Sequence, residues 1–263
     1  MSSRLPCTML VLTALAACAT THHGAGASGQ NAGLSALRSV DRDARARIGR
    51  EDMLTQMAFW AGEYDTFPND LEAAQQFAEA LRRGGRLDRA VQVANEAIGR
   101  FPQDQQLMLT YGMAQVALNH GQDALRPLAL VAQAQPQNWR VRSALGVALD
   151  QVGRYEEARQ AYREALGLRP NDPIVLSNLG MSHLLAGEPD DAETLLRQAL
   201  AQPNPPLEAR QNLAVAIALQ GRFDEAAQIE RADLPPAQAE ANIEYLRSLL
   251  SDPRSWRDMH RGG

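Results

Sequence analysis

Apolar positions in the middle of the chain recur at helical spacing and predict pairs of short helices. Within residues 139–172, Leu145 and Leu149 lie on one apolar stripe, and Gly153 follows where a left-handed residue ends a helix. A second apolar stripe starts after this glycine, and Pro170 follows it, where a helix cannot continue. The pattern therefore predicts a helix, a tight turn and a second helix, with Gly146 leaving room for the two helices to approach closely.

The same pattern returns at one interval. Gly153, Gly187 and Gly221 are equally spaced along the chain (187 − 153 = 34 and 221 − 187 = 34). A period of 34 with a Leu-Gly step, a turn glycine, alanines and a closing proline resembles the tetratricopeptide (TPR) repeat, a helix pair that buries its apolar face against its neighbours. We therefore expect an all-α fold: a TPR-type α-solenoid of antiparallel helix pairs, spanning residues 51–252.

The register places the repeats and the ends of this solenoid. Gly121 follows two residues after the expected turn position (153 − 34 = 119), which predicts a local irregularity. Met53, Leu54, Met57 and Trp60 predict an opening helix with one apolar face. The remaining units are expected at about 71–104, 105–138, 139–172, 173–206 and 207–236, followed by a capping helix at 237–251, with Ala241, Ile243, Leu246 and Leu250 facing inward, and a polar tail at 253–263.

The N-terminus indicates export. Residues 1–17 combine a basic start with a short apolar run, typical of a signal peptide. They end in Leu-Ala-Ala before Cys18, which resembles the bacterial lipobox and implies lipidation of Cys18; the alternative is an ordinary signal peptide with Cys18 incidental. Ala19 after the cysteine favours the outer membrane. Residues 18–50 are then expected to tether the domain, partly helical or close to anionic headgroups towards their end.

The composition limits the kinds of partner and ligand that the chain is expected to bind. The formal charge is −5, and removal of the signal leaves 25 − 31 = −6, so a general nucleic-acid surface is not expected. The two cysteines precede the repeats, which excludes a disulfide framework within them. The adjacent His22 and His23 have no third ligand near them in the sequence, so we expect no metal site and no cofactor.

Nothing in the sequence predicts an enzyme. Ser143, Asp150 and His183 form a triad only on paper, because His183 occupies the position of Leu149 and Ile217 in neighbouring repeats and is expected to be a packed histidine. The Walker phosphate-binding motif, the GxSxG nucleophile elbow and the HExxH zinc-protease motif are absent from the sequence.

The first helices of TPR units line the concave face, where these proteins usually hold peptides. Asn178 and Asn212 are one repeat period apart (212 − 178 = 34), and an amide there both donates and accepts hydrogen bonds to a ligand backbone. Arg140 and Gln211 are expected on the same face, with Arg140 suited to a ligand carboxylate. The alternative is that these asparagines only solvate their helices, since the preceding repeat has Ala144 there.

The C-terminal third of the repeats carries a more specific resemblance. The run Arg231-Ala232-Asp233-Leu234-Pro235-Pro236 through Asn242-Ile243-Glu244-Tyr245-Leu246, together with the lipobox and TPR units, resembles the TadD family of tight-adherence (Flp) pilus lipoproteins. This resemblance implies a periplasm-facing outer-membrane scaffold that helps the pilus secretin to assemble, in the manner of a pilotin. A second hypothesis is a lipoprotein adaptor that docks peptidoglycan enzymes.

Overall fold

The computed structural model describes residues 42–251 and divides the chain into two units at Gly49 and Arg50. The described part of the first unit is a helix over residues 42–48. Residues 1–17, Cys18 and the tail at 253–263 lie outside the described residues.

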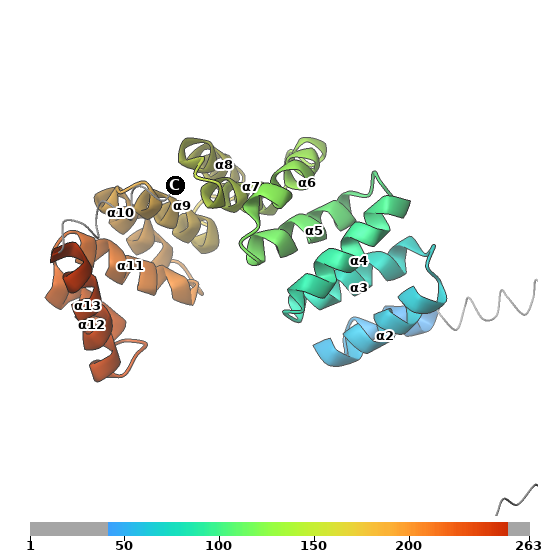
Figure 1. Ribbon diagram of the computed structural model, residues 1–263, viewed down its shortest axis with the longest axis horizontal. Coiled ribbons are helices and arrows are strands. Elements are labelled where there is room, and N and C mark those ends of the chain that lie inside the picture. Colours follow the sequence, from blue (N-terminus) through green and yellow to red (C-terminus); the bar gives the residue numbers. More distant parts are fainter. Residues whose placement is uncertain (1–41, 252–263) are drawn as a thin grey trace, which may run out of the picture. The chain divides into compact units, whose positions relative to one another are not determined.

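In the described part of the second unit, all regular secondary structure is helical, and Figure 1 shows the helices following one another as antiparallel hairpins. The predicted fold class is therefore confirmed: an all-α solenoid of TPR-type helix pairs. The helices are α2 (Met53–Thr66), α3 (Leu71–Arg83), α4 (Leu87–Arg100), α5 (Gln105–Ala117), α6 (Gly121–Ala134), α7 (Trp139–Gln151), α8 (Tyr155–Leu168), α9 (Pro173–Leu185), α10 (Pro189–Leu200), α11 (Leu207–Leu219), α12 (Phe223–Glu230) and α13 (Pro236–Ser251).

The stacking is asymmetric. Each odd-numbered helix from α3 to α11 contacts the next odd-numbered helix, whereas within residues 50–251 no even-numbered helix from α4 to α12 packs against another of that set. The odd-numbered helices, which open each pair, therefore form a continuous inner row. This row is where side chains from different repeats come together.

Turn residues keep one register throughout. Gly85, Asn119, Gly153, Gly187 and Gly221 all have positive φ and follow one another at the repeat period. The irregularity expected at Gly121 is therefore wrong: Asn119 takes the left-handed conformation, which asparagine tolerates better than most residues. Gly121 instead begins α6, where an added Cβ would lie 2.6 Å from the carbonyl oxygen of Ala148.

Small residues set the distance between the two helices of a pair. A Cβ added at Gly146 would lie 2.6 Å from the ring of Tyr162, which confirms the close approach expected at this glycine. The same relation holds one repeat earlier for Gly112 and Leu128, at 2.6 Å. In these pairs one large side chain packs directly onto the backbone at a glycine of the first helix.

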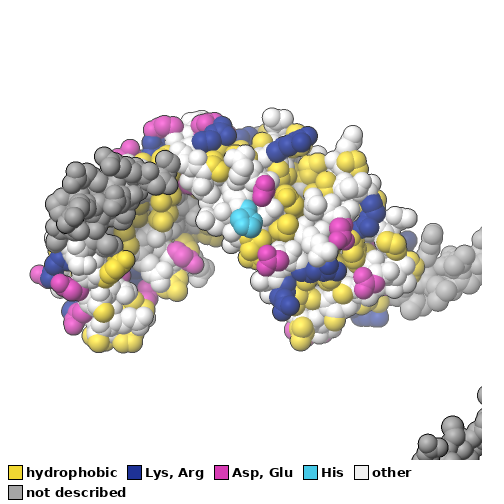
Figure 2. Space-filling model, in the orientation of Figure 1, with side chains coloured by type: hydrophobic (Ala, Val, Ile, Leu, Met, Phe, Trp, Pro, Cys, Tyr) yellow, Lys and Arg dark blue, Asp and Glu magenta, His cyan; other side chains and the backbone are white. Residues whose placement is uncertain are grey.

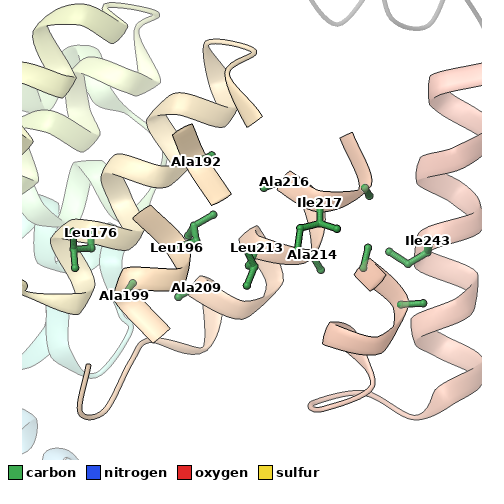
Figure 3. Packing of buried hydrophobic residues seen from close by; sticks show 13 residues of the cluster. Leu176, Ala192, Leu196, Ala199, Ala209, Leu213, Ala214, Ala216, Ile217 and Ile243 are labelled. Carbon is green, nitrogen blue, oxygen red and sulfur yellow. The ribbon is translucent and has the colours of Figure 1, made fainter. Parts of the chain in front are cut away.

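The capping helix α13 closes the C-terminal end of the core. Ile243 is buried with Leu213 and Ile217 in one apolar cluster that runs back to α9 (Figure 3), and Leu246 packs against it. Ala241 was expected to face inward but is exposed, because Ala239 and Ile243, four residues apart, define the buried stripe of α13.

The opening helix differs from its prediction in one position. Asp52 caps α2 through bonds from the backbone amides of Leu54 and Thr55, at 2.9 and 3.0 Å. Leu54 lies in the first turn and is 72% exposed rather than on the apolar face, whereas Trp60 and Tyr64 are buried. None of the helices between residues 42 and 251 combines the length and apolar character that crossing a bilayer requires.

Candidate protein-binding pocket on the inner row

Three helices of the inner row, α5, α7 and α9, border a pocket of about 300 Å³. Its lining is mainly apolar, with Arg140, Ser143 and Asn178 as the polar groups and no acidic residue. A pocket that is apolar with a few converging polar groups is the usual form of a ligand site. The lining residues are Met113, Val116, Trp139, Arg140, Ser143, Ala144, Val147, Ile174 and Asn178.

Asn178 is held in place from the neighbouring repeat. Its side-chain amide nitrogen donates to the hydroxyl oxygen of Ser143, 3.3 Å away, and Ser143 is itself buried. Within residues 42–251, no group donates a hydrogen bond to the side-chain oxygen of Asn178. Asn178 lines the pocket, and its side-chain amide oxygen keeps its capacity to accept a hydrogen bond.

Arg140 supplies the positive charge at the rim. Its guanidinium lies 4.6 Å from the centre of the Trp139 ring, and that of Arg169 lies 5.1 Å from the same ring. Arg140 is exposed and forms no ion pair with an acid of the described chain. A cation supported by an aromatic ring and lacking a carboxylate partner suits an anionic group of a ligand.

An apolar stripe extends the pocket along α9. Ile174, Met181 and Leu185 are exposed and share one helix face with Asn178, at spacings of three and four residues. The sequences of α5 and α9 contain no Asp, Glu, Lys or Arg, unlike those of α8 and α10. Figure 2 shows apolar side chains reaching the surface between charged ones. Exposed apolar surface of this kind marks sites that bind partners.

The structure brings together only part of the predicted set. Arg140 and Asn178 line the same pocket. Gln211 and Asn212 lie one repeat further on, on α11, where Gln211 is exposed and Asn212 is half-buried. Neither of these two lines the pocket.

Trp139, Met113 and Ile174 were missed by the sequence reasoning. The uncharged stretches at 105–117 and 173–185 were the signal that could have found Met113 and Ile174.

Ser143, Asp150 and His183 do not assemble into a triad. Asp150 accepts hydrogen bonds from the hydroxyls of Ser182, at 2.7 Å, and Tyr162, at 2.9 Å. Burial raises the pKa of the Asp150 carboxyl to about 6, against the lowering effect of these two bonds. Asp150 thus links α7, α8 and α9 in the core.

Comparison with known proteins agrees with this geometry. Residues 109–173, 149–207 and 207–229 each match a family model described as tetratricopeptide repeat. The chain carries tetratricopeptide repeats. Repeats of this kind form protein-interaction scaffolds, so this TPR protein is a scaffold for binding proteins.

One curated relative and several solved structures are similar to this TPR chain. The relative, TPR repeat-containing protein PA4667 of Pseudomonas aeruginosa, is 35% identical over 124 residues, which are 47% of this chain and 21% of the relative. The chain thus spans about a fifth of that relative's length.

Among solved structures, one titled MamA MSR-1 C2 has 30% identity and a TM-score of 0.52, covering 60% of this chain and 89% of that one. MamA residues 41-end from Desulfovibrio magneticus RS-1 has 20% identity and a TM-score of 0.55, covering 62% and 92%, and shows the fold alone.

Proposed function

We propose that this TPR protein is a lipid-anchored scaffold of the outer membrane that holds a segment of the tight-adherence pilus secretin while the secretin assembles. The proposed binding role is supported by the pocket on α5, α7 and α9, whose mainly apolar lining includes Arg140 and Asn178. The pilus assignment rests on the resemblance of the run at 231–246 to the TadD family, and the anchor rests on Cys18 in its lipobox setting.

The pocket defines the kind of segment it would bind. Apolar side chains of an extended partner segment would contact Met113, Val147 and Ile174. Asn178 would pair with the partner's backbone, and Arg140 would pair with a carboxylate. The partner is therefore an apolar segment with an acidic residue or a chain end, and not a strongly basic one.

Asn178 and Asn212, one repeat period apart on the inner row, form a two-membered asparagine ladder, which is tested by replacing both residues. Asn178→Ala with Asn212→Ala should weaken binding to the purified secretin at least tenfold, because each lost amide removes a pairing with the partner's backbone, worth about 1 kcal/mol. The melting temperature should change little, since Asn178 contributes one long hydrogen bond to the fold. Unchanged affinity in a titration by calorimetry would eliminate the ladder as a binding element.

The anchor is tested separately. Cys18→Ser should leave the repeats folded and move the protein from the membrane fraction to the soluble periplasmic fraction, because several acyl chains hold a protein firmly at a bilayer. Fractionation of cells that express either form measures this directly. A Cys18→Ser protein that stays with the outer membrane contradicts the lipid anchor.

The second hypothesis, an adaptor for peptidoglycan enzymes, uses the same pocket with a different partner. Co-purification of the wild-type chain from envelopes separates the two. Recovery of the secretin supports pilus assembly, and recovery of cell-wall enzymes without any secretin supports the adaptor.

A further inference from the structure

In two of the repeats, the turn between the two helices carries an arginine and, three residues later, an acid. Arg154 pairs with Glu157 at 2.6 Å in the repeat 139–172, and Arg222 pairs with Glu225 in the repeat that starts at Leu207. The first helix presents an aliphatic residue to the same turn, Leu149 or Ile217. The local charges therefore cancel in both of these repeats.

The repeat between them keeps the acid but replaces the other two residue types. One repeat period after Leu149, Arg154 and Glu157, the chain has His183, Glu188 and Asp191. The arginine has become a second carboxylate, and the aliphatic residue has become an imidazole. The substitution leaves two acids facing each other across the turn, with a histidine between them.

The three side chains converge. His183 Nδ1 lies 2.6 Å from a carboxylate oxygen of Glu188 and 3.9 Å from one of Asp191, and one ligand atom from each residue fits within 4.8 Å of the others. The backbone holds this arrangement: the Glu188 amide donates to the His183 carbonyl at 2.9 Å, and Gly187 between them has φ +79°. The turn backbone thus fixes the spacing between His183 and Glu188.

Nearby cations do not neutralise the cluster. The guanidinium of the buried Arg159 lies 3.4 Å from Glu188, but it also pairs with Glu156. Asp191 has no arginine or lysine within ion-pair distance among residues 42–251. The Arg159 guanidinium is therefore shared by Glu156 and Glu188, and Asp191 has no permanently charged cation beside it.

We propose that His183, Glu188 and Asp191 form a binding site for a divalent transition-metal ion, with Zn²⁺ as the probe. An imidazole with two carboxylates is a donor set that Zn²⁺ and its neighbours in the first row accept, whereas Mg²⁺ and Ca²⁺ prefer oxygen alone. Zinc bonds of about 2.0–2.2 Å separate adjacent ligand atoms by about 3.3 Å, so the short contact opens and the long one closes by less than about 1 Å.

The site is open to the ion and spans the two helices of its repeat. The side chains of Glu188 and Asp191 are 41% and 71% exposed, whereas that of His183 is 14% exposed, so the imidazole is fixed and the carboxylates can adjust. Metal binding would fasten α9 to α10 beside the apolar stripe of α9 and would stabilise that repeat.

The test is calorimetric titration of Zn²⁺ into the full chain, purified in detergent without a histidine tag and first stripped with a chelator. The wild type should bind Zn²⁺ and show a raised melting temperature, with no such effect from Mg²⁺. His183→Leu, which restores the aliphatic residue found at Leu149, and the exposed Asp191→Asn should each lower the affinity at least tenfold while the apo proteins melt as the wild type does.

A matched control separates this site from the N-terminal histidines. His22→Ser with His23→Ser should keep the zinc-induced rise in melting temperature. Loss of the rise in that variant, or zinc affinity unchanged in both His183→Leu and Asp191→Asn, overturns the proposal.

Discussion

At the scale of single residues, the repeats are held by a small set of matched pairs. Gly146 faces Tyr162, and Gly180 faces Leu196, where added Cβ atoms would lie 2.6 and 2.8 Å from the partner. Tyr162 also donates its hydroxyl proton to Asp150, so one side chain fills the space over the glycine and satisfies a buried carboxylate. The repeat period of 34 predicts which glycines pack against a large side chain, because the glycine and its partner both recur at that interval.

Gly146→Ala should destabilise the protein by about 1–3 kcal/mol, since the new methyl overlaps the Tyr162 ring in a packed interface. Gly167→Ala is the matched control: it lies in α8 with no atom within 4 Å of the new Cβ, and it should stabilise by up to about 1 kcal/mol. Urea unfolding of both variants measures the difference. Equal effects from the two substitutions would contradict the assigned packing.

The buried Asp150 should make stability depend on pH. Its pKa is raised to about 6 in the folded chain from 3.8, so the folded state holds this proton more tightly than the unfolded state does. The stabilisation from this proton is full below pH 3.8 and is lost as pH rises through about 6. The nearby charged groups are Arg159 and His183, whose positive charge would lower this pKa.

The measurement compares the wild type with Asp150→Asn, in a chelator, over this pH range. The free energy of unfolding of Asp150→Asn relative to the wild type should rise as pH increases, because the amide imitates the protonated carboxyl. A difference that does not vary with pH shows that Asp150 titrates normally.

At the scale of elements, the turns follow the sequence register even where the residue type departs from it. Four turns use glycine at positive φ, and the turn after α5 uses Asn119 at φ 61°. The glycine pattern alone places this turn at Gly121, two residues after the residue with positive φ. Helix packing, not turn propensity, explains that glycine, since it lies against the backbone of α7.

Two substitutions distinguish these roles. Asn119→Gly should keep or slightly raise stability, because glycine adopts positive φ without strain. Gly121→Ala should lower stability by about 1–3 kcal/mol, because its methyl would meet the Ala148 carbonyl 2.6 Å away. Thermal unfolding of the two variants decides the point, and a stable Gly121→Ala protein would contradict the close contact with α7.

The helices and their order could be predicted from the sequence, but the pocket could be predicted only in part. Periodic apolar positions place each helix and its buried face, so Asn178 and Arg140 fall on the inner row as expected. Which inner-row side chains share one pocket depends on the stacking angle between repeats, which no local pattern encodes. For that reason Asn212, equivalent to Asn178 in the register, does not line it.

The sequence also could not reveal the link formed by Asp150. Its partners Tyr162 and Ser182 come from two other helices, 12 and 32 residues away. The neighbouring repeats have Val116 and Leu184 in the register position of Asp150, so the repeat period gives no hint of a buried carboxylate.

At the scale of the whole molecule, the proposed scaffold binds a protein segment at the pocket on α5, α7 and α9 of the inner row. Helices α5 and α9 have no Asp, Glu, Lys or Arg, whereas α8 begins with two glutamates and α10 has two aspartates in its first turn. The two uncharged helices thus border the pocket, and α7 between them contributes Arg140 to its lining.

Site-specific photocrosslinking in living cells tests this claim most directly. A photoreactive phenylalanine analogue at position 174, in place of the half-exposed Ile174 of the pocket, should crosslink the pilus secretin. The same analogue in place of Glu164, on the outer helix α8, should not. Secretin crosslinks from position 174 alone are the predicted result; crosslinks from position 164 only, or none from 174 to any envelope protein, would contradict it.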